Sequence, residues 1–120
     1  MARPAAIERA FKRLDSYSQI WEHRNVRVLG EAILARFATK HADARGPLQR
    51  FLEIARSARW RHYAAVKDTF RATDRGKQTG RLIFDIGGNK YRLIASVDFA
   101  EQLLVIERVL THEDYEREMF

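Results

Sequence analysis

The sequence predicts an α+β fold, in which N-terminal helices pack on a small, mainly antiparallel sheet and a short helix ends the chain. Two observations predict this class. Apolar residues recur at helical spacing up to about residue 60, and from Arg81 onward they alternate with a period of two. Tight turns link the later strands into a meander, and helices grouped before hairpin-linked strands are typical of α+β proteins.

Helical patterns mark three segments in the first half of the chain. The first runs from Pro4 to about His23, and Pro4 suits a first-turn position. The second covers Glu31 to His41. The third opens at the Gly46-Pro47 break and continues to about Arg59. A short strand over Val26–Val28 separates the first two helices, and a partly helical connector is expected to reach Phe70.

Three strands follow a polar loop over residues 71–80. Gly87-Gly88-Asn89 closes the first hairpin, because Gly and Asn tolerate the positive φ that such turns require. Asp98 to Gln102 closes the second hairpin, and Thr111 can cap a short final helix. The predicted strands are Arg81–Ile86, Lys90–Val97 and Leu103–Leu110.

Composition bounds the function. The 120-residue chain is long enough for one domain with a real core, and it has a net charge of +6. Residues 1–79 carry 17 Lys and Arg against 8 Asp and Glu, whereas residues 80–120 carry 5 against 8. The excess of positive charge in residues 1–79 suggests a polyanion partner, although an arginine-rich composition alone would give the same excess.

Three features of the composition favour the cytoplasm. The chain has no cysteine, which excludes disulfides and thiolate zinc sites and agrees with a reducing compartment. Its N-terminus lacks the long apolar segment of a secretory signal. No apolar run reaches the roughly 18 residues that span a bilayer, so no membrane association is expected.

The strand Lys90–Val97 carries the first candidate site residues. Lys90 and Arg92 are predicted to leave one face, about 7 Å apart, while Tyr91 and Leu93 leave the other face toward the core. This separation matches the spacing of successive phosphates in a single strand. The alternative is a solvated sheet edge with two basic side chains.

His112 and Tyr115 lie at the predicted junction of the last strand and the last helix. An imidazole can transfer protons near neutral pH, and one helical turn would bring Tyr115 to the same side. The alternatives are a surface histidine and a tyrosine that packs on the sheet. Glu107 and Arg108 are predicted to point to opposite faces of the last strand, so at most one of them faces a cleft.

A basic cluster surrounds Trp60. Aromatic residues beside cations are what single-stranded bases stack on, although Trp60 could instead anchor a helix end in the core. No Gly-rich phosphate loop and no metal-ligand spacing appears, since the histidines at 23, 41, 62 and 112 are scattered. Any chemistry is therefore expected to need neither a metal nor another cofactor. The cations of the cluster that we expect at RNA are Arg59, Arg61, Lys67 and Arg71.

Two blocks together resemble the HigB toxin family, within the RelE-like group of bacterial toxin–antitoxin systems. They are Gly-Asn-x-Tyr-Arg-Leu at 88–93 and Thr-His-x-x-Tyr at 111–115, about 20 residues apart. The resemblance runs from about Val26 to the C-terminus. We therefore expect a toxin domain over residues 26–120 and an N-terminal helical extension over residues 1–25.

The resemblance implies an endoribonuclease that cuts mRNA in the ribosomal A site, and a cognate HigA-like helix-turn-helix antitoxin. In such enzymes the ribose 2′-OH attacks the adjacent phosphate without a metal. Lys90 and Arg92 would stabilise the phosphorane charge, His112 would be the general acid or base, and Tyr115 would position the base or phosphate. Asn89 and Arg108 complete the expected RNA contacts, although a hairpin tip favours a structural role for Asn89.

One position departs from the family pattern. Relatives often have an arginine five residues before the histidine, and here that position is Glu107, followed by Arg108. Either the cation has moved to the opposite face or its role is lost. A non-catalytic RNA-binding module, or a protein-interaction subunit whose basic groove receives an acidic partner, therefore stays an alternative.

Overall fold

The computed structural model describes residues 24–118, so the predicted helix from Pro4 to His23 lies outside the described residues. A five-stranded sheet has the order β1-β5-β4-β3-β2 and is antiparallel except for β1, which runs parallel to β5. The strands are β1 (Arg27–Leu29), β2 (Asp74–Arg75), β3 (Leu82–Ile86), β4 (Tyr91–Asp98) and β5 (Leu103–Thr111).

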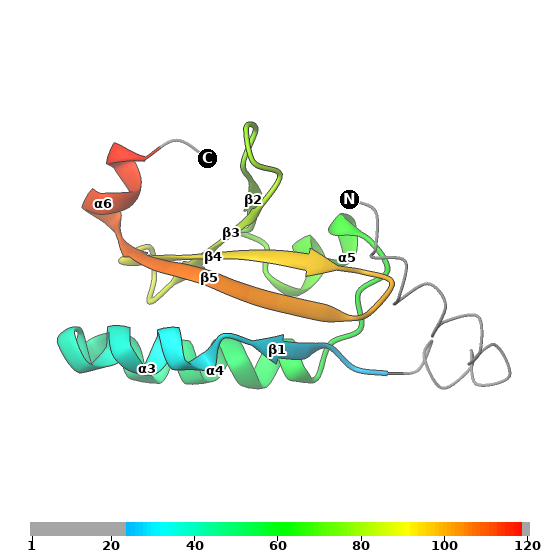
Figure 1. Ribbon diagram of the computed structural model, residues 1–120, viewed down its shortest axis with the longest axis horizontal. Helices are drawn as coiled ribbons and strands as arrows, with labels where there is room; N and C mark the ends of the chain where they lie inside the picture. Colours follow the sequence, from blue (N-terminus) through cyan, green and yellow to red (C-terminus); the bar gives the residue numbers. More distant parts are fainter. Residues whose placement is uncertain (1–23, 119–120) are drawn as a thin grey trace, which may run out of the picture.

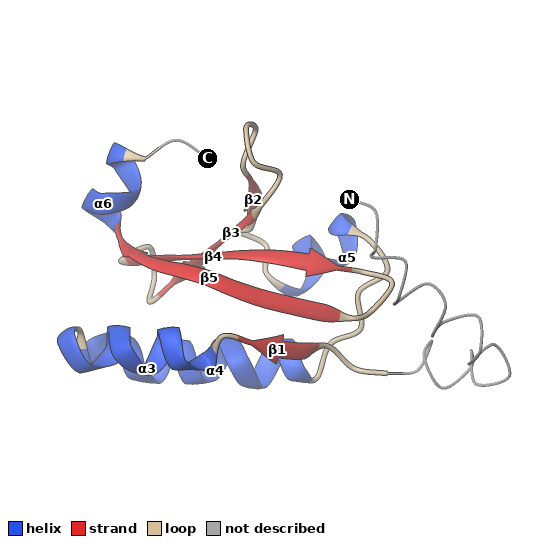
Figure 2. Cartoon of the chain, in the orientation of Figure 1, coloured by secondary structure: helices blue, strands red, loops and turns tan. Residues whose placement is uncertain are grey.

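Helices α3 and α4 lie along one face of the sheet, and α6 rises on the opposite side (Figure 1). We call the side opposite α3 and α4 the open face. The helical segments are α3 (Glu31–Lys40), the 3-10 turn η2 (Ala42–Ala44), α4 (Arg45–Arg56), α5 (Tyr63–Thr69) and α6 (His112–Arg117). Helices before a strand meander confirm the predicted α+β class, as the colouring of Figure 2 shows.

Two predicted boundaries are wrong. The third helix ends at Arg56 rather than Arg59, because the amides of Ser57 and Ala58 turn back to carbonyls three residues earlier and tighten the last turn. The predicted loop 71–80 contains β2, which pairs with Ile83 and Leu82 of β3. A two-residue polar strand has no periodicity of its own, so only its pairing reveals it.

The main core lies between the sheet and the helices. Leu93 and Ala95 of β4 are fully buried in it, together with Phe84 of β3. The Phe51 ring of α4 packs against Phe84 with ring centroids 5.0 Å apart. Trp60 is 1% exposed and its indole N–H donates to Thr69 Oγ1 at 3.0 Å. Trp60 is therefore a core anchor and not a base-stacking platform.

The open face has a smaller apolar cluster. Ile83, Ile94 and Leu110 are buried in it, and Tyr115 of α6 packs against them. The alternation predicted for β4 is thus confirmed, since Ile94 faces away from Leu93 and Ala95. The cluster also explains why α6 sits on this face: its tyrosine covers apolar side chains that α3 and α4 leave uncovered.

A β-bulge interrupts β5. Ile94 pairs with Arg108 and the next residue, Ala95, pairs with Ile106, so Glu107 is an extra residue without an opposite partner in β4. Arg108 shares the open face with Ile94, and the Glu107 carboxylate accepts from Ser96 Oγ at 3.1 Å on that same face. The prediction that Glu107 and Arg108 point to opposite faces is therefore wrong.

Candidate active site

The start of α6 fixes His112 beside the start of β4. The Thr111 side chain caps the helix by accepting from the Asp114 amide at 3.1 Å, which confirms the predicted cap. The His112 amide donates to the Lys90 carbonyl at 3.1 Å. The helix is therefore tied to the sheet at its first residue, and the imidazole projects from that junction with its side chain 48% exposed.

Arg92 is the buried cation of the open face, with a side chain only 10% exposed. Its Nε lies 3.2 Å from Asp85 Oδ1, on the residue directly opposite in β3. Its Nη1 donates to the Asn89 carbonyl at 3.1 Å, and its Nη2 donates to Asn89 Oδ1. Asn89 has a φ of 82°, so the left-handed turn residue aims both of its oxygens at the guanidinium. These contacts hold Arg92 in one orientation.

Arg92, His112 and Tyr115 come together on the open face. Arg92 Nη2 is 3.4 Å from His112 Nδ1, and Arg92 Cζ lies 5.3 Å from the centre of the Tyr115 ring. His112 Nε2 is 3.4 Å from Glu116 Oε1, one helical turn away. Because a guanidinium can only donate, a neutral His112 has its lone pair on Nδ1 and its proton on Nε2, where Glu116 accepts it.

This arrangement can hold an anion and move a proton. The Arg92 guanidinium supplies fixed positive charge, and the His112 Nδ1 beside it supplies a lone pair that can accept a proton. The Tyr115 ring lies beside the guanidinium. A cation, a base and a phenol within one small surface suit the chemistry of a phosphodiester.

Lys90 does not join this cluster. Its Nζ lies 3.3 Å from Asp43 Oδ2, and the Tyr91 hydroxyl donates to the same carboxylate. Tyr91 belongs to the core on the helix side, so the Lys90 ammonium points toward that side and away from Arg92. The predicted shared face is wrong because Lys90 lies in the turn before β4, where strand alternation does not apply.

The contacts among Lys90, Asp43 and Tyr91 perturb two titratable groups. The hydrogen bond from Tyr91, followed by that from Lys90, lowers the pKa of Asp43 below its ordinary value of 3.8. Accepting that bond, Asp43 raises the pKa of Tyr91 above its ordinary value of 10.0. Both shifts favour the pair as an ionised carboxylate and a neutral phenol.

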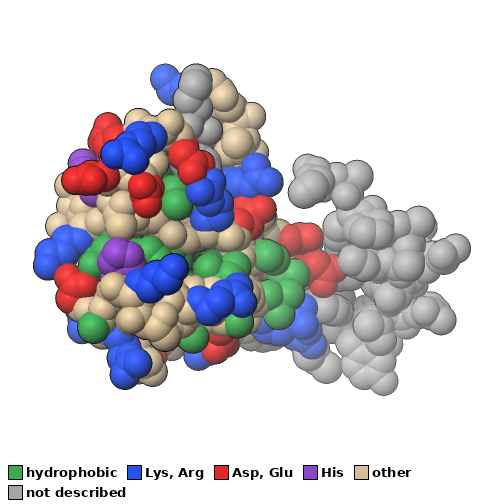
Figure 3. All heavy atoms as spheres, turned by 60° about the vertical axis from the view of Figure 1, so that its left-hand side comes forward, with side chains coloured by type: hydrophobic (Ala, Val, Ile, Leu, Met, Phe, Trp, Pro, Cys, Tyr) green, Lys and Arg blue, Asp and Glu red, His purple; other side chains and the backbone are tan. Residues whose placement is uncertain are grey.

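Carboxylates also hold two more arginines on the open face. Arg81 contacts Glu107, and both terminal guanidinium nitrogens of Arg108 contact Glu118. Figure 3 shows acidic and basic side chains interspersed over this end of the molecule rather than a uniform basic patch. The departure at Glu107 thus keeps a cation, Arg108, on the open face, but that cation has its own carboxylate partner.

Sequence reasoning missed the carboxylates of the site. Glu116 could have been found from its position four residues after His112 on a helix. Asp85 could have been found from the tight turn, because a Gly-Gly-Asn hairpin puts it opposite Arg92. Glu118 offered no such signal, since its contact with Arg108 depends on how α6 folds back over β5.

The basic cluster near Trp60 lies elsewhere. Arg61, Lys67 and Arg71 are exposed around α5, and α5 and α6 lie toward opposite ends of the view in Figure 1. Arg59 Nε donates to Asn25 Oδ1 at 2.9 Å. Tyr63 is also occupied, because Arg75 lies 4.2 Å from the centre of its ring. The structure therefore does not join these cations to the Arg92 cluster.

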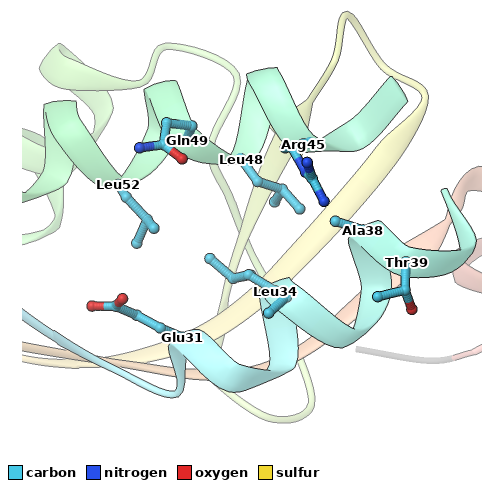
Figure 4. Close-up of a pocket in the computed structure, with 9 residues that line it drawn as sticks. Glu31, Leu34, Ala38, Thr39, Arg45, Leu48, Gln49 and Leu52 are labelled. Carbon is cyan, nitrogen blue, oxygen red and sulfur yellow. The ribbon is translucent and has the colours of Figure 1, made fainter. Parts of the chain in front are cut away.

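A cavity of about 520 Å³ lies between α3 and α4. In Figure 4 the Leu34 and Leu48 side chains point toward each other from the two helices, with Arg45 near one end and Glu31 near the other. Its lining contains no histidine, cysteine or tyrosine, and the carboxylate in it, Glu31, forms an ion pair with Arg56. The Arg92 cluster is the stronger candidate for an active site.

Two further features of residues 24–118 bear on cofactors and membranes. Within that range, no three His, Asp or Glu side chains gather in a way that could ligate a metal ion. None of the helices in the same range is both long enough and apolar enough to cross a bilayer.

Comparison with protein families gives the class of protein. Residues 44–118 match the model of the HigB toxin, described as the RelE-like toxic component of a toxin-antitoxin system. The match covers more than half of the chain and includes the hairpin that carries Arg92 and the helix that carries His112 and Tyr115. The chain belongs to the HigB toxin family. No curated protein matches the chain.

Proposed function

We propose that this protein is the toxin of a type II toxin–antitoxin system and that it cleaves translated mRNA on the ribosome. The observation that carries the proposal is the convergence of Arg92, His112 and Tyr115 on the open face. Membership of a family of RelE-like toxic components supports it. The protein would act in the cytoplasm, and a HigA-like helix-turn-helix antitoxin would neutralise it.

The chemistry follows from the positions of three side chains. His112 Nδ1 accepts the proton of a ribose 2′-OH, and the freed oxygen attacks the adjacent phosphorus. Negative charge develops on the phosphorane oxygens, where the Arg92 guanidinium stabilises it. The P–O5′ bond then breaks, the leaving oxygen takes a proton from a water molecule, and the His112 imidazolium gives its proton to the hydroxide so formed. The products are a 2′,3′-cyclic phosphate and a 5′-hydroxyl end. Tyr115 borders the ribonucleotide and positions it.

Neighbouring polar side chains hold these groups in place. Asp85 and Asn89 fix the Arg92 guanidinium before substrate arrives, so little reorganisation is needed during the reaction. Glu116 accepts from His112 Nε2 and so favours the tautomer with the lone pair on Nδ1. Lys90 is not assigned a role in the reaction, because its ammonium contacts Asp43.

A specific observation favours a second candidate, a non-catalytic RNA-binding module. Glu107 occupies the place of an expected arginine and pairs with Arg81, so the open face holds less free positive charge than the family pattern implies. Such a module would bind RNA in a salt-sensitive way and leave no new RNA ends.

Expression in growing cells tests the proposal. The wild-type protein is expected to arrest growth and to create new 5′-hydroxyl ends on translated mRNA, mapped by sequencing, whereas naked mRNA stays intact. Arg92→Ala and His112→Ala are each expected to restore growth. Arg36→Ala is the matched control, because Arg36 is an exposed cation of α3 with no carboxylate partner among the described residues. Folded Arg92 and His112 variants that arrest growth as fully as wild type would exclude this site.

A further inference from the structure

The guanidinium of Arg108 is occupied by a carboxylate from the end of α6. Its Nη1 contacts Glu118 Oε2 and its Nη2 contacts Glu118 Oε1, so the two groups meet as parallel forks. The Glu118 amide donates to the Tyr115 carbonyl at 3.1 Å, which ties Glu118 to the last turn of α6. The Arg108 side chain is 47% exposed and that of Glu118 is 35% exposed, so solvent reaches the pair.

Arg108 lies on the same face as Arg92 and close to it. Arg92 pairs with Leu110 across β4 and β5, so Arg108 is its diagonal neighbour on the adjacent strand. Diagonal neighbours of this kind have their Cβ atoms roughly 7–8 Å apart or somewhat less. That separation is comparable to the spacing of successive phosphates in a single strand. A strand with one phosphate at Arg92 would therefore bring the next phosphate near Arg108.

A carboxylate and a phosphate bind an arginine fork in the same geometry, so either can replace the other. An exposed ion pair is weak enough for a competing anion to open it. We propose that Arg108 is a second phosphate-binding subsite of the active site, and that Glu118 is its resting occupant, which the RNA displaces. The inference rests on the proposed function only in taking RNA as the ligand.

The neighbouring ion pair on this face, between Arg81 and Glu107, is less easily opened by a phosphate. Arg81 contacts Glu107 through Nε alone, and the Glu107 carboxylate is held by Ser96 as well. Displacing the Glu107 carboxylate would break its contacts with both Arg81 and Ser96. Glu118 instead follows the last turn of a short helix. The hydrogen bond from Arg108 lowers the pKa of Glu118, so the occupant is fully ionised at neutral pH.

Binding of a short 2′-O-methyl oligoribonucleotide, which cannot be cut because it lacks the attacking hydroxyl, tests the subsite. Fluorescence anisotropy at low salt is expected to show about two- to five-fold tighter binding by Glu118→Gln, the range that loss of an exposed ion pair allows. Arg108→Gln is expected to weaken binding and to reduce the salt slope by about 0.7, the value for one lost phosphate contact on a single strand.

Two comparisons separate displacement from a general charge effect. Glu113→Gln removes the same charge from α6, but Glu113 contacts no cation within residues 24–118, so a smaller gain is expected. Glu118→Gln added to Arg108→Gln is expected to give no further gain. Arg108→Lys keeps the charge without the fork and should bind more weakly than wild type, and thermal unfolding checks that each variant is folded.

Equal gains from Glu113→Gln and Glu118→Gln would overturn the subsite, as would a Glu118→Gln gain that persists without Arg108. Absence of any oligonucleotide binding would overturn it too. Because the probe cannot be cut, the expected binding pattern without mRNA cleavage in cells would reject the proposed nuclease and keep the subsite. Cleavage of mRNA in cells without the expected binding pattern would reject the subsite and keep the proposed nuclease.

Discussion

Arg92 is the residue whose removal gives the most quantitative test. Replacing it with Met deletes the buried cation and leaves the Asp85 carboxylate, 31% exposed, without its ion-pair partner. Breaking a fully buried pair costs about 3–5 kcal/mol. Because water reaches part of Asp85, we expect Arg92→Met to lower the free energy of unfolding by about 2–3 kcal/mol. A domain with a typical stability of about 5–15 kcal/mol would remain folded.

A double variant separates stability from catalysis. Arg92→Met combined with Asp85→Asn removes both charges, so no unpaired carboxylate remains and the loss of stability should shrink to about 1 kcal/mol. Cleavage should stay at least about 100-fold below wild type, because the group that stabilises the phosphorane charge is missing. Urea unfolding at constant slope measures the free energy of unfolding, and a purified translation system measures the rate of mRNA cleavage.

Two results would refute this reasoning. If Arg92→Met alone costs less than about 0.5 kcal/mol, the pair with Asp85 does not hold the site together. If the double variant regains cleavage, the positive charge at this position is not part of the reaction.

Two further predictions concern the neighbouring carboxylates. Glu116→Ala should lower cleavage about 10-fold and change its pH profile, because His112 loses the acceptor that sets its tautomer; an unchanged profile would show that Glu116 does not act through His112. Asp43→Asn should lower the melting temperature at neutral pH. The pKa of Asp43 is depressed in the folded protein. The contribution of this carboxylate to folding stability is therefore present above its ordinary pKa of 3.8, and it is lost as the pH falls through the pKa of the folded state. A difference that is independent of pH would contradict this cause.

The periodicity of the sequence determined the elements. Helical spacing located α3 and alternation located the three long strands, because each pattern reports which side chains of a segment must be buried together. Turn chemistry set the hairpin that brings Arg92 opposite Asp85, and a threonine cap set the start of α6 with His112 at its first position. These are local properties, so the residues near the candidate site could be recognised from the sequence.

Only the tertiary structure decided how the charges are partnered. Lys90 turns to Asp43, 47 residues earlier in the chain, and the bulge at Glu107 places that residue and Arg108 on one face. Glu118 reaches Arg108 only because α6 folds over the open face. Ion pairs and bulges depend on which strands and helices become neighbours, and no periodic pattern within one segment encodes that choice.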